Sequence, residues 1–344
     1  MSGNLWRRGA HLAVGALLVA GYYAGLPEHL WDAPEGFQPS PGGMEVATPA
    51  WSITELAASP ELADAQLMAR GNRLVAFWRE GPSLRLARTG DGEASWTTET
   101  LSEVNAGRRG LLQAVMVSGW EEPAILLRRR TGVGQQWHLL RDGRERPLPL
   151  ASVPGVNWHA GPAVALADGG TGLPLHAPGT GRMALLRLGP DGDVRGLHPA
   201  GPSRAGRSAP GLLVENRAEA LLLTGPGARS RATANGGIDW RPLEMDLPDE
   251  VSDGFTPVRR GAGWWWLLSV TQRDGREILR VQESRDGGAG WRERETAALE
   301  TGQSGNCAGS LPAARHTRDG RLHLLHVTGD CRLLHARLVA GEAQ

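Results

Sequence analysis

Short apolar runs, in which hydrophobic and polar positions alternate, repeat along most of the chain. Residues 65–68 and 73–78 are two such runs, and they flank a turn at residues 69–72 that contains glycine and asparagine. A third run at residues 84–88 leads into a Gly- and Asp-rich turn at residues 89–92. Alternation over a few residues between turns is typical of β-strands, and no ten-residue stretch here keeps a helical period. The pattern predicts an all-β fold.

The turns recur at a nearly constant interval. Six of them are centred on Asp91, Asp142, Asp191, Asn235, Asp286 and Asp330. Successive centres lie 51, 49, 44, 51 and 44 residues apart. A period of about 48 residues is the size of a four-stranded propeller blade, and six such blades need about 290 residues. Since this is the length between Trp51 and Val339, we predict a six-bladed β-propeller of four-stranded antiparallel blades over residues 51–340.

Three of the turns share a longer pattern, in residues 89–96, 233–240 and 284–291. Each begins with a hydroxyl residue, has Asp or Asn two positions later followed by glycine, and ends with Trp five positions after the Asp or Asn. The Asx side chain can accept hydrogen bonds from its own turn, glycine permits positive φ, and the Trp can pack between blades. These octapeptides resemble the Asp-box, or BNR repeat, of the sialidase (neuraminidase) superfamily. Because Asp-boxes are structural in that family, we expect purely structural roles for Asp91, Trp96, Asn235, Trp240, Asp286 and Trp291.

The resemblance extends beyond the turns. Residues 72–81, 161–176 and 310–323 are similar to the first-blade segment, the central strand pair and the closing blade of bacterial sialidase-like proteins. Sialidases bind the substrate carboxylate with three arginines, use an Asp as acid and base, and attack with a Tyr that a Glu activates. Here Ala308 stands where the nucleophile would be, and both tyrosines of the chain lie at positions 22 and 23. The Arg-Ile-Pro-like motif that supplies the first arginine is missing too, so we do not expect the tyrosine-dependent mechanism.

Other residues could support a different hydrolysis or the recognition of a sugar. Two carboxylates that converge on the axis could act as acid and base, and the candidates near strand ends are Glu80, Glu215 and Asp253. Arginines can bind a carboxylate bidentately, and histidines can stack on or hydrogen-bond a sugar. The candidates for substrate binding are Arg79, Arg128, Arg315, His159 and His176. The alternative is that these are solvated loop carboxylates, surface arginines and ordinary hairpin histidines.

Composition excludes several other functions. The chain has 37 basic and 37 acidic residues, and all the basic ones are Arg. A neutral balance argues against a nucleic-acid partner, and the absence of Lys excludes Schiff-base and P-loop mechanisms. No spacing of Cys and His suggests a zinc site, and no cofactor is indicated. Cys307 and Cys331 either form a disulfide, which an oxidising compartment would favour, or are two buried thiols.

The N-terminal residues do not fit the repeat. Trp6-Arg7-Arg8 precedes residues 9–26, which carry no formal charge apart from an optional one on His11. This stretch is just long enough to span a bilayer, and the preceding arginines favour a cytoplasmic N-terminus. We therefore predict a membrane anchor over residues 1–27, with a cleaved signal peptide as the alternative. Residues 28–50 are rich in Pro and Gly and predict a tether. Either reading places the propeller outside the cytoplasm, in a periplasmic or extracellular location, or secreted.

Two functional hypotheses follow. The first is a membrane-tethered, sialidase-like propeller that recognises or hydrolyses a glycan or glycoconjugate without a tyrosine nucleophile. The second is a non-catalytic propeller scaffold that assembles other envelope proteins at the membrane surface. The resemblance in the central strands favours the first hypothesis, although fold alone does not establish function.

Overall fold

The structure is a computed structural model, and it describes residues 50–90, 95–103, 110–118, 124–131, 134–148, 157–166, 168–202, 210–224, 230–245, 247–248, 255–273, 276–299, 307 and 312–339. Within these ranges the chain forms strands joined by turns. None of these ranges contains a helix that is long and apolar enough to cross a membrane. The predicted anchor over residues 1–27 and, apart from Ala50, the predicted tether over residues 28–50 lie outside the described residues.

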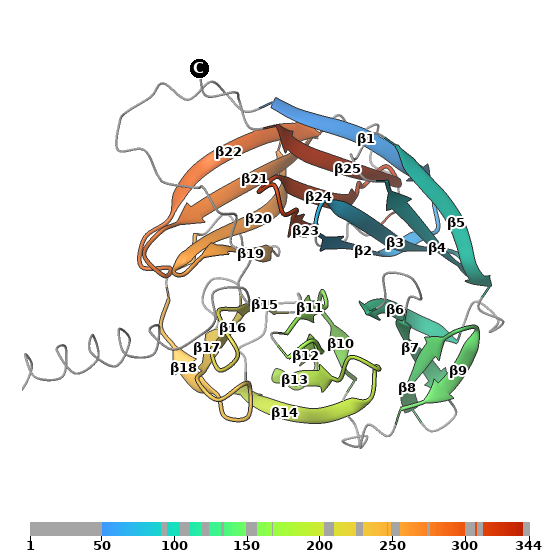
Figure 1. Cartoon of the computed structure of the whole chain (residues 1–344), viewed down its shortest axis with the longest axis horizontal. Coiled ribbons are helices and arrows are strands. Elements are labelled where there is room, and N and C mark those ends of the chain that lie inside the picture. Colours follow the sequence, from blue (N-terminus) through green and yellow to red (C-terminus); the bar gives the residue numbers. More distant parts are fainter. Residues whose placement is uncertain are drawn as a thin grey trace, which may run out of the picture. The chain divides into compact units, whose positions relative to one another are not determined.

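The strands of the described residues form six antiparallel sheets, which are the blades of a propeller (Figure 1). Blade one comprises β2 (Leu62–Arg70), β3 (Arg73–Glu80), β4 (Ser83–Thr89) and β5 (Trp96–Glu103). Blade two comprises β6 (Leu111–Ser118), β7 (Ala124–Thr131), β8 (Gly134–Arg141) and β9 (Arg144–Pro147). Blade three comprises β10 (His159–Ala160), β11 (Val164–Ala165), β12 (Thr171–Ala177), β13 (Arg182–Leu188) and β14 (Val194–Pro202). Here β10 and β11 both pair with β12, so they act as one interrupted first strand.

The other three blades have four strands each. Blade four comprises β15 (Gly211–Val214), β16 (Ala220–Leu223), β17 (Ser230–Thr233) and β18 (Arg241–Leu243). Blade five comprises β19 (Thr256–Gly261), β20 (Trp264–Arg273), β21 (Arg276–Ser284) and β22 (Arg292–Leu299). Blade six comprises β23 (Ala313–His316), β24 (Leu322–Val327), β25 (Arg332–Val339) and β1 (Ala50–Ala58). The predicted six-bladed propeller of four-stranded antiparallel blades is confirmed.

The ring closes through β1, which comes from the start of the fold and pairs with β25 as the fourth strand of blade six. This closure corrects one element of the predicted repeat. The turns at Asp142, Asp191, Asn235 and Asp286 join third to fourth strands, but the turn at Asp330 joins β24 to β25, the second and third strands of blade six. Blade six has no third-to-fourth turn because its fourth strand is supplied by the N-terminal side of the chain.

The two ends of each blade carry different connections. First strands of neighbouring blades lie side by side around the axis: β2 lies next to β6 and β23, and β19 lies next to β15 and β23. Strand direction alternates within a blade, so turns from first to second and from third to fourth strands share one end, here called the lower end. The first strands begin, and the second strands turn into the third, at the opposite end, here called the upper end. The position of a residue within its strand therefore shows whether the residue lies toward the upper or the lower end.

The core lies between the blades. Among the described residues the buried apolar side chains form six clusters, and each cluster joins one pair of neighbouring blades. Alternation along β3 shows how: Leu74, Ala76 and Trp78 pack toward blade six, whereas Val75 and Phe77 pack toward blade two. Successive side chains of a strand point to opposite faces of the sheet, so a strand between two neighbours must be apolar on both faces.

Two glutamine side chains connect first strands near the axis. Met116 N donates a hydrogen bond to Oε1 of Gln66 at 2.9 Å, and Gln66 Nε2 donates to Ala114 O at 3.3 Å, which joins blade one to blade two. Gln113 and Ala160 make the same reciprocal pair between blades two and three, at 2.7 and 3.1 Å. Each amide supplies one donor and one acceptor to the backbone of the first strand in the next blade. These bridges fix the upper parts of blades one to three relative to one another.

Candidate functional site

Two of the three octapeptides lie within the described residues, and they adopt the same hydrogen-bonded turn. In the second, Asp239 N donates to Oδ1 of Asn235 at 2.9 Å, and Gly237 N donates to the Thr233 hydroxyl at 3.0 Å. In the third, Gly290 N donates to Oδ1 of Asp286 at 2.9 Å, and Gly288 N donates to the Ser284 hydroxyl at 2.8 Å. The glycines after Asn235 and Asp286 have φ of 72° and 71°. The predicted turn chemistry is confirmed at both positions, while Asp91 lies outside the described residues.

The tryptophans that end the three octapeptides pack between blades. Trp96 lies against the cluster between blades one and six, Trp240 against the one between blades three and four, and Trp291 against the one between blades four and five. Trp240 also donates from Nε1 to the carbonyl of Gly237 in its own turn at 2.9 Å. These partly buried side chains thus contribute to the packing between neighbouring blades.

Cys307 and Cys331 form a disulfide, with their Cα atoms 5.3 Å apart. Cys307 precedes β23, and Cys331 lies in the turn between β24 and β25 with φ of 67°. The bond therefore connects the segment that enters blade six to the blade's own second-to-third turn, at the upper end.

Two of the three predicted carboxylates, Glu80 and Glu215, do not converge. Glu80 ends β3 at the upper end, where Arg85 Nε donates to it at 3.2 Å. Glu215 directly follows β15 at the lower end, where its carboxylate accepts from Arg259 Nε at 2.9 Å and from Nε1 of Trp265. Both contacts of Glu215 cross from blade four to blade five, so this side chain connects blades. Glu80 and Glu215 cannot act as a catalytic pair because they lie at opposite ends of the propeller.

The third predicted carboxylate, Asp253, lies outside the described residues, as does Ala308. The structure therefore places neither of them. Among the described residues, no group of three or more His, Cys, Asp or Glu side chains is arranged to hold a metal ion.

Four of the five predicted substrate-binding residues lie toward the upper end, whereas the fifth, Arg315, is the next-to-last residue of β23 and lies toward the lower end. Arg79 lies near the end of β3, and Arg128 lies in β7, both before second-to-third turns. His159 begins β10, His176 lies near the end of β12, and Arg315 lies in the short β23. Four of these five residues come from blades one to three, and Arg315 reaches them from blade six.

Arg79 is paired with an acid that the sequence analysis missed. Arg79 Nε donates to Oδ2 of Asp64 at 2.7 Å, and the backbone N of Ala114 in blade two donates to the same oxygen at 3.0 Å. Burial raises the pKa of Asp64 above its ordinary value, although the positive charges of Arg79 and Arg128 act against this rise. Asp64 has φ of 56° at a register shift in β2. The only signal in the sequence is an acidic residue within a mainly apolar strand.

Arg128 is a buried arginine, with 5% of its surface exposed. Its Nη1 donates to the carbonyl of Trp158, just before β10, and its Nε is buried without a hydrogen-bond partner among the described residues. Burial lowers the pKa of Arg128, and the charge of Asp64 opposes this shift. The guanidinium is thus held at low solvent exposure next to the first strand of blade three.

Arg315 reaches across the ring. Its Nη2 donates to the carbonyl of Ala163 in blade three, which lies opposite blade six in the ring order, and its Nη1 donates to Ala314 O at 2.7 Å. Burial lowers the pKa of Arg315 to about 10. Among the described residues no carboxylate contacts this guanidinium. Arg128 and Arg315 therefore donate to backbone carbonyls of one short segment, residues 158–163, and bring two positive charges to it.

The two histidines are neighbours on β10 and β12. His159 and His176 are directly paired in the strand register, and their ring centroids lie 5.6 Å apart. Burial, together with the positive charge of Arg128, lowers the pKa of His159 to about 4. At neutral pH this imidazole is uncharged, so it can donate one hydrogen bond and accept another. The upper end thus combines cationic and neutral polar groups, with Asp64 already bound to Arg79.

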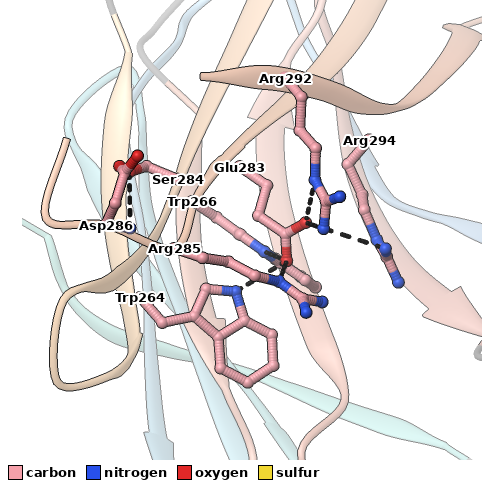
Figure 2. A network of polar contacts seen from close by, with 8 residues as sticks. All are labelled: Trp264, Trp266, Glu283, Ser284, Arg285, Asp286, Arg292 and Arg294. Carbon is pink, nitrogen blue, oxygen red and sulfur yellow. Dashed lines mark hydrogen bonds and ion pairs between the residues drawn. The ribbon is translucent and has the colours of Figure 1, made fainter. Parts of the chain in front are cut away.

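A second polar cluster, which the sequence analysis did not identify, lies at the lower end of blade five (Figure 2). Glu283, near the end of β21, has no exposed side-chain surface. Its Oε2 accepts from Nε and Nη2 of Arg292 at 2.9 and 2.6 Å, and its Oε1 accepts from Trp264 Nε1 at 2.7 Å and Arg285 Nε at 3.2 Å. Nη1 of Arg294 lies 3.8 Å from Oε2.

Cation–π contacts extend this cluster toward blade six. The guanidinium carbon of Arg260 lies 4.6 Å from the ring centroid of Trp266 and 5.2 Å from that of Trp264. Burial lowers the pKa of Arg260 below its ordinary value, which the charge of Glu283 partly offsets. A sequence signal existed here: one arginine lies within the third octapeptide, at position 285, and two follow it, at positions 292 and 294, while a strand that begins with three tryptophans precedes it.

Comparison with known proteins gives the fold. No protein-family model and no curated protein matches the sequence. The structure is similar to the Hadza microbial sialidase Hz136, with a TM-score of 0.62 and 12% identity, over 82% of this chain and 66% of that chain. It is also similar to the NanB sialidase from Streptococcus pneumoniae, with a TM-score of 0.52 and 8% identity, over 83% of this chain and 70% of that chain.

A subtype N10 neuraminidase-like protein from a little yellow-shouldered bat isolate is similar too, with a TM-score of 0.51 and 10% identity, over 86% of this chain and 99% of that chain. The chain therefore has a sialidase-like six-bladed propeller fold. It spans just under two thirds of the length of Hz136.

Proposed function

We propose that this protein is an exported, membrane-tethered propeller that recognises a carboxylate-bearing glycan near its axis, between Arg128 and Arg315, without hydrolysing it. The observation that carries the proposal is the guanidinium of Arg315, which reaches from blade six to the carbonyl of Ala163 in blade three and has no carboxylate partner among the described residues. A buried cation without a counter-ion is costly unless something supplies negative charge. A bound carboxylate would do so.

The groups around Arg315 suit a sugar acid. Arg128 brings a second guanidinium to the same backbone segment, and charge-assisted hydrogen bonds from arginine to carboxylate are about twice as strong as neutral ones. His159 stays uncharged at neutral pH and offers a donor and an acceptor of the kind that sugar hydroxyls need. The sialidase-like fold adds to this: three of its structural neighbours are sialidases or neuraminidase-like by name.

Recognition is favoured over hydrolysis because no catalytic pair is in place among the described residues. Glycoside hydrolysis needs two carboxyl groups a few ångströms apart, or a tyrosine nucleophile in sialidases. Glu80 and Glu215 lie at opposite ends, and Asp64 is bonded to Arg79 and to the backbone of Ala114.

Export and tethering are the part of the proposal that concerns the N-terminal residues. The disulfide between Cys307 and Cys331 supports it, because such bonds persist in oxidising compartments. Fractionation of the native cells and N-terminal sequencing of the mature protein test this part. Retention of residues 1–27 in the membrane fraction is expected, and a cytoplasmic protein would overturn it.

Calorimetric titration of the full chain with sialyllactose, and with lactose as the matched neutral sugar, tests the glycan proposal. We expect binding of sialyllactose alone and no release of free sialic acid. Arg315→Gln should weaken binding by about tenfold or more, because it removes the uncompensated charge. Arg182→Gln, at an exposed arginine that begins β13 at the upper end, should leave the affinity unchanged. Equal binding of both sugars, or of neither, would refute the proposal, and the second result would favour the scaffold hypothesis with envelope proteins as partners.

A further inference from the structure

The lower-end cluster in blade five holds more positive charge than its one carboxylate can neutralise. Arg285, Arg292 and Arg294 surround Glu283, and their side chains are 50%, 58% and 37% exposed, while that of Glu283 has no exposed surface. Figure 2 shows Arg292 and Arg294 on one side of the carboxylate and Arg285 on the other. With three cations and one anion in contact, the group keeps a net positive charge at its solvent-exposed side.

The other described acids near this cluster are engaged elsewhere. Asp286 accepts hydrogen bonds from the Ser284 hydroxyl at 2.8 Å and from Gly290 N at 2.9 Å, within its own turn. Glu293 alternates with Arg292 and Arg294 along β22, so it points to the other face of the sheet, and it pairs with Arg280 at 3.0 Å.

The guanidinium groups also have spare donors. Each offers five N–H groups, whereas a carboxylate has about four acceptor positions, two of which receive the indole N–H groups of Trp264 and Trp266. Glu283 engages Nε of Arg285 and Nε and Nη2 of Arg292, and it lies at ion-pair distance from Nη1 of Arg294. The remaining N–H groups of these half-exposed side chains face away from the carboxylate.

Two of these arginines, Arg285 and Arg292, are also held in place. Arg292 is bound to Glu283 through two nitrogens, and Arg285 stacks over the ring of Trp264 with its guanidinium carbon 5.1 Å from the ring centroid. Fixed side chains lose little conformational entropy when they bind a ligand, so the cluster is preorganised. The guanidinium carbon of Arg260 also lies 5.2 Å from the ring centroid of Trp264. Because two arginines stack on this indole, we do not expect it to stack on a sugar ring.

We propose that Arg285, Arg292 and Arg294 form a binding site for an oxyanion group, phosphate, sulfate or carboxylate, either free or carried by a sugar. The arginines donate charge-assisted hydrogen bonds to the oxyanion, and the buried Glu283 orients them from beneath. The site lies at the lower end of blade five and shares no residue with the proposed glycan site, so it does not depend on that site.

Titration calorimetry of the full chain in a weakly coordinating buffer tests the site, with inorganic phosphate, inorganic sulfate, acetate and galactose 6-sulfate as separate arms. We expect saturable binding with a stoichiometry of one anion per chain. A preference for the tetrahedral anions over acetate identifies a phosphate or sulfate ligand, and tighter binding of galactose 6-sulfate than of inorganic sulfate identifies a sugar-borne one. No saturable binding in any arm would overturn the proposal.

Variants separate this site from general salt effects. Arg285→Gln and Arg294→Gln should each weaken binding by about tenfold or more, because each removes one charged donor while the two hydrogen bonds from Arg292 to Glu283 stay in place. Arg276→Gln removes the same charge from an exposed position at the other end of β21 and should bind as the wild type does. Near-ultraviolet circular dichroism of each variant checks that it is folded. Folded Arg285→Gln and Arg294→Gln proteins with wild-type affinity would overturn the proposal.

Discussion

Replacement of Glu283 by glutamine should destabilise the propeller in a pH-dependent way. Burial acts to raise the pKa of Glu283, but hydrogen bonds from Arg292, Trp264, Trp266 and Arg285 outweigh it and lower the pKa to about 2. Against an ordinary value of 4.5, this corresponds to about 3 kcal/mol of stability at neutral pH. Because the arginines are 37–58% exposed, solvent screens part of the interaction, and we expect Glu283→Gln to cost about 1–2 kcal/mol.

The sign of the pH dependence follows from the direction of the shift. The folded-state pKa lies below the unfolded-state pKa, so the contribution of Glu283 is complete above about pH 5 and is lost as the pH falls toward 2. Urea unfolding followed by Trp fluorescence at pH 7 and at pH 3.5 measures the difference between wild type and Glu283→Gln. That difference should shrink at the lower pH, since at pH 3.5 the carboxylate is already mostly protonated in the unfolded chain while it stays ionised in the folded protein.

A matched control is Glu293→Gln, on the neighbouring strand. Glu293 is 46% exposed and pairs with Arg280 at 3.0 Å, so its loss should cost about 0.5 kcal/mol or less. If Glu283→Gln costs no more than Glu293→Gln, or costs the same at both pH values, the reasoning about the buried carboxylate is wrong.

Three further changes test the fold. Replacing Cys307 and Cys331 by serine should remove about 3 kcal/mol of stability, because the disulfide closes a loop with a sequence separation of 24; an unchanged melting temperature would contradict this. Asn235→Ala removes the side-chain acceptor of its turn and should lower the free energy of unfolding in urea by about 1 kcal/mol. An unchanged free energy of unfolding would show that the Asn235 side chain does not stabilise the turn. Gly288→Ala should cost about 2 kcal/mol or more, because φ is 88° and a Cβ would lie 2.6 Å from a neighbouring methionine. Gly287→Ala, with φ of 71° and open space, should lower the melting temperature less; equal losses would mean that crowding is not the cause.

Much of the fold could be predicted because its signals are local. Alternation within the runs at residues 65–68 and 73–78 reports strands whose faces are both covered, and each turn needs a particular residue at a particular place. Asn235 and Asp286 accept hydrogen bonds from their own turns, which requires no information from the rest of the chain. The spacing of such turns was therefore enough to count the blades. The same rule failed for Asp330, because a turn does not show which pair of strands it joins.

The candidate site was less predictable because it depends on contacts between distant parts of the chain. Arg128 and Arg315 were both proposed from residue type, but only the closed ring brings them to the same backbone segment of blade three. Glu80 and Glu215 were proposed on the same grounds, and the alternation of strand direction places them at opposite ends.

Residue chemistry and local periodicity thus specify strands, turns, blade number and the kinds of groups that a site can use. The partner of each buried charge is decided by tertiary structure. Asp64 is bonded to Arg79 in its own blade and to the backbone of the next one, and Glu283 accepts hydrogen bonds from β20, from β22 and from the turn between β21 and β22. Electrostatic interactions act over a few ångströms in space and not along the sequence, so charge pairing, pKa values and binding sites become defined only when the ring closes.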